Sequence, residues 1–164
     1  MSPADTPTDK TGGKRGRSGA VSARRRARQA ALQGLYEWLI GRGEAAVIQV
    51  HVEEQEVHSG CDVEHFRRLL HGCIEQAGAI DAVLSRHIDR RLNELSPVEH
   101  AALMIGAYEL LHCVEVPYRV AINEAVELAK TFGGTDGHKY VNGVLDKAAA
   151  DCRPGEAGSR RSNA

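Results

Sequence analysis

The sequence contains no long uncharged stretch. Outside the termini, the longest run without a formal charge is nine residues, His100 to Tyr108, whereas a helix that crosses a membrane needs about 20 apolar residues. The first twenty residues are polar and glycine-rich and contain no apolar segment of the kind found in secretory signals. We therefore expect a soluble, cytoplasmic protein with no membrane contact.

Catalytic and metal-binding motifs are also missing. There is no P-loop, no glycine-rich dinucleotide fingerprint after a strand, no nucleophile elbow and no His-Glu-x-x-His pattern, so we expect a protein that is not an enzyme and has no cofactor. The four cysteines form no Cys-x-x-Cys pair and are expected to stay reduced inside a cell. His58, Cys61 and His65 have a metal-like spacing, but a structural zinc site needs four such ligands, so we predict no metal.

The charge is unevenly distributed, although the formal net charge is only −1. Residues 1–28 carry eight Lys and Arg against two Asp, a net +6, and residues 153–164 carry three Arg against one Glu, a net +2. Residues 29–152 carry ten cations and nineteen acids, a net −9. The basic start suits phosphate and the acidic body suits a basic protein, but charge alone is equally compatible with a tail that only adds solubility.

The apolar spacing between the termini is helical. A helix is expected over 22–41, with Ser22 as its N-cap. Segment 44–56 is ambiguous because it contains strand-like alternation, but it has no partner strand, so a helix is preferred. A further amphipathic helix begins at Asp62, is interrupted at Gly78 and resumes to about residue 92.

The clearest local signal is Ser96-Pro97-Val98-Glu99. Ser96 is expected to cap a helix over 98–112, Pro97 suits its first position, and Glu99 completes a capping box. Two more helices follow. The first covers 120–132 and ends at Gly133-Gly134 as a left-handed cap, and the second begins at Thr135 or Asp136.

These patterns predict an all-α protein of about seven helices in two helical halves. A single folded domain is expected over residues 22–152. The low-complexity ends, 1–21 and 153–164, are expected to be a disordered basic arm and a disordered tail.

Two features suit single-stranded nucleic acid. Consecutive arginines begin the first predicted helix, and their guanidinium groups can bind phosphate and stack on bases; the residues are Arg24, Arg25, Arg26 and Arg28. The second feature is the glycine-rich segment 132–140, where backbone N–H groups, cations and rings can meet a ligand. The alternative for this segment is a plain helix–loop–helix joint with two core rings.

The residues around this segment resemble the NusB family of bacterial transcription antitermination factors. The resemblance covers about residues 22–152 and is carried chiefly by VPYRVAINEAVELAK at 116–130 and DGHKYVNGVLDK at 136–147. It implies an all-helical protein of two subdomains that binds the boxA sequence of ribosomal RNA leader transcripts. It also implies that the protein binds with NusE, a small-subunit ribosomal protein, and acts within the RNA polymerase antitermination complex.

By position, the resemblance also implies site residues. The RNA-binding set comprises Arg24, Arg25, Arg26, Arg28, Phe132, Asp136, His138, Lys139 and Tyr140. The set facing NusE comprises Glu99, Tyr36 and Tyr118. The sequence departs from the family at Gly137, where Ser is frequent, at Tyr140, where Phe is usual, and at His100, where a cation is more usual.

Two other interpretations remain open at this stage. NusB-like domains are also found fused to ribosomal RNA cytosine methyltransferases, so the chain could be an accessory RNA-binding domain that works with such an enzyme. Exposed aromatic side chains could instead support a homodimer that hides the RNA-binding face, and the sequence does not decide between monomer and dimer.

Overall fold

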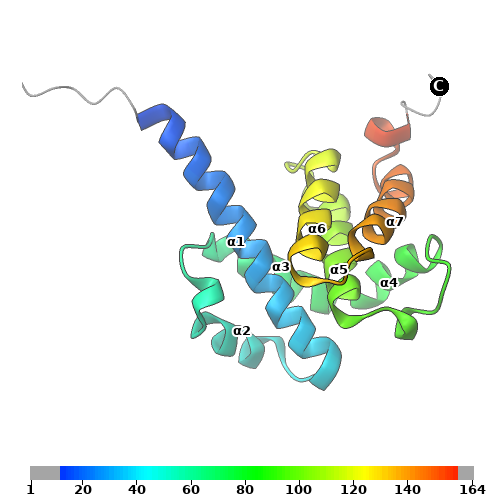
Figure 1. Cartoon of the computed structure of the whole chain (residues 1–164), viewed down its shortest axis with the longest axis horizontal. Helices are drawn as coiled ribbons and strands as arrows, with labels where there is room; N and C mark the ends of the chain where they lie inside the picture. Colours follow the sequence, from blue (N-terminus) through cyan, green and yellow to red (C-terminus); the bar gives the residue numbers. More distant parts are fainter. Residues whose placement is uncertain (1–11, 159–164) are drawn as a thin grey trace, which may run out of the picture.

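The longest helix, α1 (Gly12–Gly41), organises the fold. The structure is a computed structural model that describes residues 12–158, and the side chains of residues 19, 20 and 22–157 within them. The C-terminal part of α1 packs against α3 and α5, while its first turns project beyond the other helices (Figure 1). The buried stripe of α1 is formed mainly by small residues and leucines: Ala27, Ala30, Ala31, Leu32 and Leu35.

Two helices complete the first half of the molecule with α1. These are α2 (Ala45–Glu53) and α3 (Val63–Glu75), with a 3₁₀ turn, η1 (Glu56–His58), between them. The chain reverses between α1 and α2 through Arg42 and Gly43, which both have positive φ angles, 57° and 103°. Only glycine adopts that conformation without cost, so Gly43 suits the turn and Arg42 is strained.

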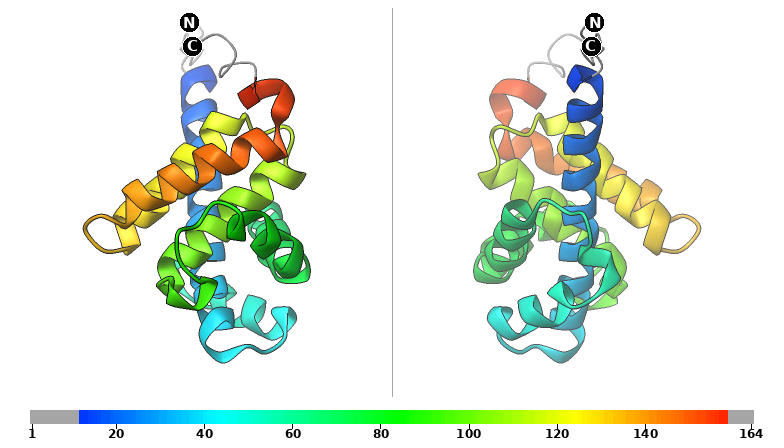
Figure 2. Two further views of the ribbon diagram at one scale, coloured as in Figure 1. Left: turned by 90° about the vertical axis from the view of Figure 1, so that its right-hand side faces the viewer. Right: turned by 90° about the vertical axis from the view of Figure 1, so that its left-hand side faces the viewer.

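The second half is built around α5 (Pro97–His112), in which every residue from 101 to 110 is buried. α6 (Tyr118–Phe132) and α7 (Gly137–Cys152) form an antiparallel pair against it, and Figure 2 shows their connecting loop at the tip of this pair. α5 approaches α7 closely at Gly106, where a Cβ atom would lie 2.5 Å from Leu145. The remaining elements are α4 (Ala77–Ser85), the 3₁₀ turn η2 (Leu92–Glu94) and a short π-helical turn, η3 (Pro154–Gly158).

The predicted all-α class is confirmed, and no strand occurs among residues 12–158. Two predicted caps are present: the Asp62 side chain accepts a hydrogen bond from the His65 N–H, and Ser96 accepts one from the Glu99 N–H. The ambiguous segment 44–56 is helical over most of its length. Short-range signals predicted these features because their partners lie within one helical turn.

Three predicted helix boundaries and one predicted cap are wrong. α1 begins at Gly12, so Ser22 lies inside the helix and does not cap it. The break between α3 and α4 falls at Gln76 rather than Gly78, and α4 ends at Ser85 rather than near residue 92. Gly133 is extended, with φ −95° and ψ −175°, so it is not a left-handed cap.

The two ends are helical where the structure describes them, and the disorder expected of the ends stays a prediction. Residues 12–21 belong to α1, and residues 1–11 lie outside the described residues. At the other end, residues 153–158 fold back onto α5, and residues 159–164 lie outside the described part. Arg153 holds this segment against the end of α5. Its buried guanidinium donates hydrogen bonds of 2.6–2.9 Å to four backbone carbonyls, those of Glu109, Leu110, Cys113 and Val116.

Candidate nucleic-acid interface

The arginine run of α1 divides into one buried and three accessible side chains. Arg28 is only 4% exposed, and its guanidinium donates hydrogen bonds to the Glu109 carboxylate, with Nε–Oε1 and Nη2–Oε2 distances of 2.9 and 3.0 Å. Glu109 is fully buried. Arg28 therefore cannot offer its guanidinium to RNA, and its predicted role in RNA contact is corrected to a structural one.

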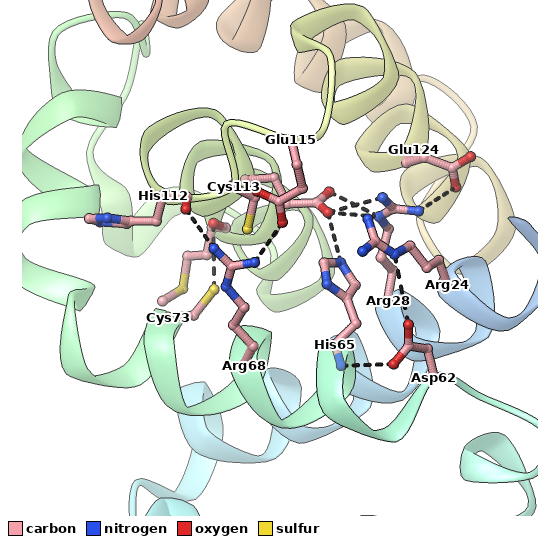
Figure 3. Close-up of polar contacts among 12 residues, drawn as sticks. Arg24, Arg28, Asp62, His65, Arg68, Cys73, His112, Cys113, Glu115 and Glu124 are labelled. Atoms are coloured by element: carbon pink, nitrogen blue, oxygen red, sulfur yellow. Dashed lines mark hydrogen bonds and ion pairs between the residues drawn. The ribbon is translucent and has the colours of Figure 1, made fainter. Parts of the chain in front are cut away.

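Glu109 also binds His65, which brings three helices together at one carboxylate. The His65 Nε2 atom lies 2.9 Å from Glu109 Oε2, so α1, α3 and α5 meet at this carboxylate. Figure 3 labels the two side chains that bind it, Arg28 and His65. Burial raises the pKa of the Glu109 carboxyl, but hydrogen bonds from His65 and Arg28 outweigh it and hold that pKa below its usual value. The Glu109 carboxylate is therefore ionised in the folded protein near neutral pH.

The accessible arginines differ in how firmly they are held. Arg25 binds the Glu124 carboxylate of α6 with two hydrogen bonds of 3.0 and 3.2 Å, and this contact raises the pKa of Arg25. Arg24 makes a longer ion pair of 3.7 Å with Asp62. The exposed Arg26 makes no ion pair with any acid of the described residues. Arg26 is thus the arginine of this run that phosphate can reach without displacing a carboxylate.

The predicted second feature lies at the tip of the α6–α7 pair. Phe132, at the end of α6, is 45% exposed, so it is not a core ring. Asp136 and Lys139 are both well exposed and form an ion pair of 3.4 Å, while His138 is half-buried. The loop thus presents a ring, a cation and a carboxylate to solvent.

Tyr140 is arranged differently from the expected free stacking ring. The guanidinium carbon of Arg90 lies 4.2 Å from the centroid of its ring, in cation–π geometry. The ring is half-buried, and burial raises the pKa of its hydroxyl. One face of Tyr140 is therefore already covered within this chain.

α6 connects the two features. Glu124, which holds Arg25, lies eight residues before Phe132 on the same helix, about 12 Å along its axis. A single strand of a few nucleotides can span that distance. The structure therefore places Arg25 beside α6 about two turns before the loop, although they are more than 100 residues apart in sequence.

The three residues expected to face NusE do not form one patch. Glu99, at the start of α5, lies against Gly137 at the start of α7, where an added Cβ atom would meet its Oε1 at 2.7 Å. Tyr118 follows the other end of α5, about 20 Å away along the helix. Tyr36 is exposed on the C-terminal part of α1. A partner that touched both Glu99 and Tyr118 would have to span about 20 Å.

Arg90 and Arg153 could not be identified as important residues from the sequence alone. Arg90 lies in an irregular segment after α4, where a basic pair has no specific meaning, and Arg153 lies beyond the last clear apolar period. Their partners, Tyr140 and the carbonyls at the end of α5, are distant in sequence. Only the tertiary structure reveals these roles.

Other types of site are not evident in the part of the chain that the structure covers. Within residues 12–158, no group of three or more His, Cys, Asp or Glu side chains is arranged to hold a metal ion. The predicted metal-like spacing is used otherwise, since His65 binds Glu109 and His58 packs edge-on against Phe66. None of the described helices is long and apolar enough to span a bilayer.

The fold and the charged surface together define a class: an all-helical protein whose cations gather along its first helix and around the α6–α7 loop. Comparison with known proteins identifies the family within this class. The NusB family model matches residues 25–150, and the chain belongs to the NusB family. This confirms the resemblance inferred from the sequence.

The relatives cover most of the chain. It is 57% identical over 144 residues to the transcription antitermination protein NusB of Bordetella pertussis, covering 85% of this chain and 94% of that protein. It is 54% identical over 140 residues to the NusB of Cupriavidus pinatubonensis, covering 85% and 84%. Both relatives are named transcription antitermination proteins, and the match covers 94% and 84% of their length.

Solved structures agree on the fold. T. maritima NusB superposes with a TM-score of 0.71 at 34% identity, covering 82% of this chain and 96% of that one. A structure of antitermination factors NusB and NusE in complex with double-stranded RNA gives a TM-score of 0.68 at 23% identity, covering 77% and 96%. The second likeness supports the all-α fold alone.

Proposed function

We propose that this protein is a cytoplasmic transcription antitermination factor without catalytic activity. In this proposal it binds the boxA sequence of ribosomal RNA leader transcripts together with NusE and joins the RNA polymerase antitermination complex. Family membership supports the role, since its relatives are antitermination proteins. The NusB of similar fold that was solved with NusE and double-stranded RNA suggests NusE and RNA as the partners to test.

The observation that carries the proposal is the pairing of accessible arginines with the α6–α7 loop. Arg25 and Arg26 both offer guanidinium groups to phosphates. Arg25 lies against α6 at Glu124, and Phe132 offers an exposed ring at the end of that helix. Stacking of a base on an aromatic ring contributes about 1–3 kcal/mol. Phosphate contacts by cations combined with stacking of bases on aromatic rings are typical of single-strand binding.

The acidic body fits the second partner. Residues 29–152 carry a net charge of −9, and ribosomal proteins that bind RNA are basic. Glu99 lies next to the start of α7, beside the proposed RNA-binding loop. In the proposal, NusE docks near this end of α5, so that RNA contacts both proteins.

A gel-shift or anisotropy titration tests the proposal. A boxA single strand and a scrambled strand of the same composition are titrated with this protein, with NusE and with both. The proposal predicts preference for boxA and tighter binding when both proteins are present. Equal affinity for the two strands, with and without NusE, would contradict it.

A further inference from the structure

Gly143 stands in the middle of α7 without a packing reason. It is exposed, and a Cβ atom built on it meets no described atom within 4 Å. At Gly106, by contrast, an added Cβ would clash with Leu145. A glycine inside a helix costs about 0.5–1 kcal/mol relative to alanine. A bare stretch of backbone at such a position suits the close approach of a ligand.

Gly143 forms part of a pocket between α7 and the segment after α4. The pocket has a volume of about 230 Å³. Lys139 and Lys147, one helical turn before and after Gly143, flank it, and Tyr140 and Asp89 also line it. Lys147 is exposed and makes no ion pair with an acid within residues 12–158. Lys139 and Lys147 therefore lie on either side of the exposed backbone at Gly143.

Arg90 adds a stacking surface at the edge of this pocket. One face of its guanidinium covers Tyr140 at 4.2 Å, and Asp89 accepts a hydrogen bond of 2.8 Å from its Nε. The Arg90 side chain is 40% exposed, so its outer face is open to solvent. A planar guanidinium held over an aromatic ring can also stack on a nucleobase.

The charges of the pocket favour an anion over a protein side chain. Among the residues that line it, Lys139 and Lys147 outnumber Asp89, whose charge is already paired with Arg90. Asp151, an acid close to the lining residue His87, accepts a hydrogen bond of 2.6 Å from it. Asp136 lies 3.4 Å from Lys139, but both side chains are well exposed. Such an ion pair is weak, so a phosphate can replace Asp136 as the partner of Lys139.

We propose that this pocket is a nucleotide subsite for single-stranded RNA, with a phosphate between Lys139 and Lys147 over Gly143 and a base on the outer face of Arg90. The proposal rests on the proposed function and extends it, because it carries the RNA path from the α6–α7 loop along α7. Arg90 becomes an RNA-contacting residue, and Gly143 is the point where the strand comes closest to the helix.

Paired variants test the subsite. Gly143→Leu fills the pocket, and Gly143→Ala adds a single methyl group; Gly78→Ala, at an equally open position on α4 outside the pocket, is the control. Arg90→Ala is compared with Arg91→Ala, which changes an exposed neighbour outside the pocket. It is also compared with Arg90→Lys, which keeps the positive charge but lacks the planar guanidinium group. Affinity for a boxA single strand and for NusE is measured for each variant, with thermal unfolding alongside.

The subsite predicts that Gly143→Ala unfolds at a temperature no lower than the wild type, yet binds boxA RNA more weakly, with Gly143→Leu weaker still. Arg90→Ala should lose about 5- to 150-fold in affinity, the equivalent of one stacked base. Arg90→Lys should recover only part of the loss, and both control variants should bind as the wild type does.

Three results would overturn the subsite. In the first, boxA affinity is the same for the Gly143 and Arg90 variants as for their controls, while the wild type still binds boxA. In the second, these variants weaken NusE binding but not RNA binding, which would make the pocket a protein-docking surface. In the third, the wild type does not bind boxA at all, with or without NusE, and the proposed function itself fails.

Discussion

Arg28 and Arg26 lie two residues apart on one helix, yet the structure gives them opposite roles. Arg28 is buried against Glu109, whereas Arg26 is exposed and makes no ion pair with the described acids. The difference follows from the helical repeat, because neighbouring residues point in directions about 100° apart. A run of identical side chains on a helix therefore need not be one site, and burial decides which members can meet a ligand.

The largest expected effect in this comparison is on stability. Arg28→Ala leaves the Glu109 carboxylate buried without its main partner, and breaking a buried ion pair from one side costs about 3–5 kcal/mol. Urea unfolding measures the loss. Arg26→Ala is the matched control and should change the free energy of unfolding by less than about 0.5 kcal/mol. Similar losses for both variants would break the comparison.

Arg153 provides a second buried guanidinium with a different kind of partner. Arg153→Ala removes the donor from four carbonyls at and beyond the end of α5, with an expected cost of about 2–4 kcal/mol. Unfolding by guanidinium chloride checks this value, with the exposed Arg91→Ala as control. A variant as stable as the wild type would show that residues 153–158 add nothing to the fold.

The cluster of Arg28, His65 and Glu109 predicts that the stability of the fold depends on pH. Because the pKa of Glu109 is lowered on folding, its contribution to stability is complete above the unfolded value of about 4.3 and is lost as the pH falls through the folded pKa. The free energy of unfolding should therefore fall below about pH 4.3, and more steeply for the wild type than for Glu109→Gln. Parallel curves for the two proteins would remove Glu109 from the explanation.

A smaller effect concerns Arg25, which stands between the two extremes. Its guanidinium is held by Glu124, so a phosphate must compete with that carboxylate. Glu124→Gln should raise affinity for a boxA strand by up to about fivefold, the worth of a partly exposed ion pair. Glu75→Gln, an exposed position on α3 that makes the same charge change, is the control. Weaker binding by Glu124→Gln would mean that Glu124 positions Arg25 rather than competing for it.

The comparison also shows what a single sequence can and cannot reveal. The caps at Asp62 and Ser96 were predictable because donor and acceptor lie three residues apart. The burial of Arg28 was not, because Glu109 is 81 residues away and nothing near Arg28 indicates it.

The same distinction applies to the candidate site. The exposed loop residues Phe132, Asp136 and Lys139 were predictable as a group from one contiguous motif. The cover of Tyr140 by Arg90 joins two segments 50 residues apart, so only the folded chain shows it. The roles of these residues in RNA contact stay predictions.

The most direct test of the central claim is the salt dependence of boxA binding by the wild type and by Arg26→Ala. If Arg26 neutralises one phosphate of a single strand, its loss should reduce the slope of log affinity against log salt by roughly 0.7. The unfolding temperature should stay unchanged, and Arg67→Ala, an exposed arginine of α3 paired with Glu53, should leave the slope as it is. An unchanged slope for Arg26→Ala would contradict the assignment of the accessible arginines to RNA.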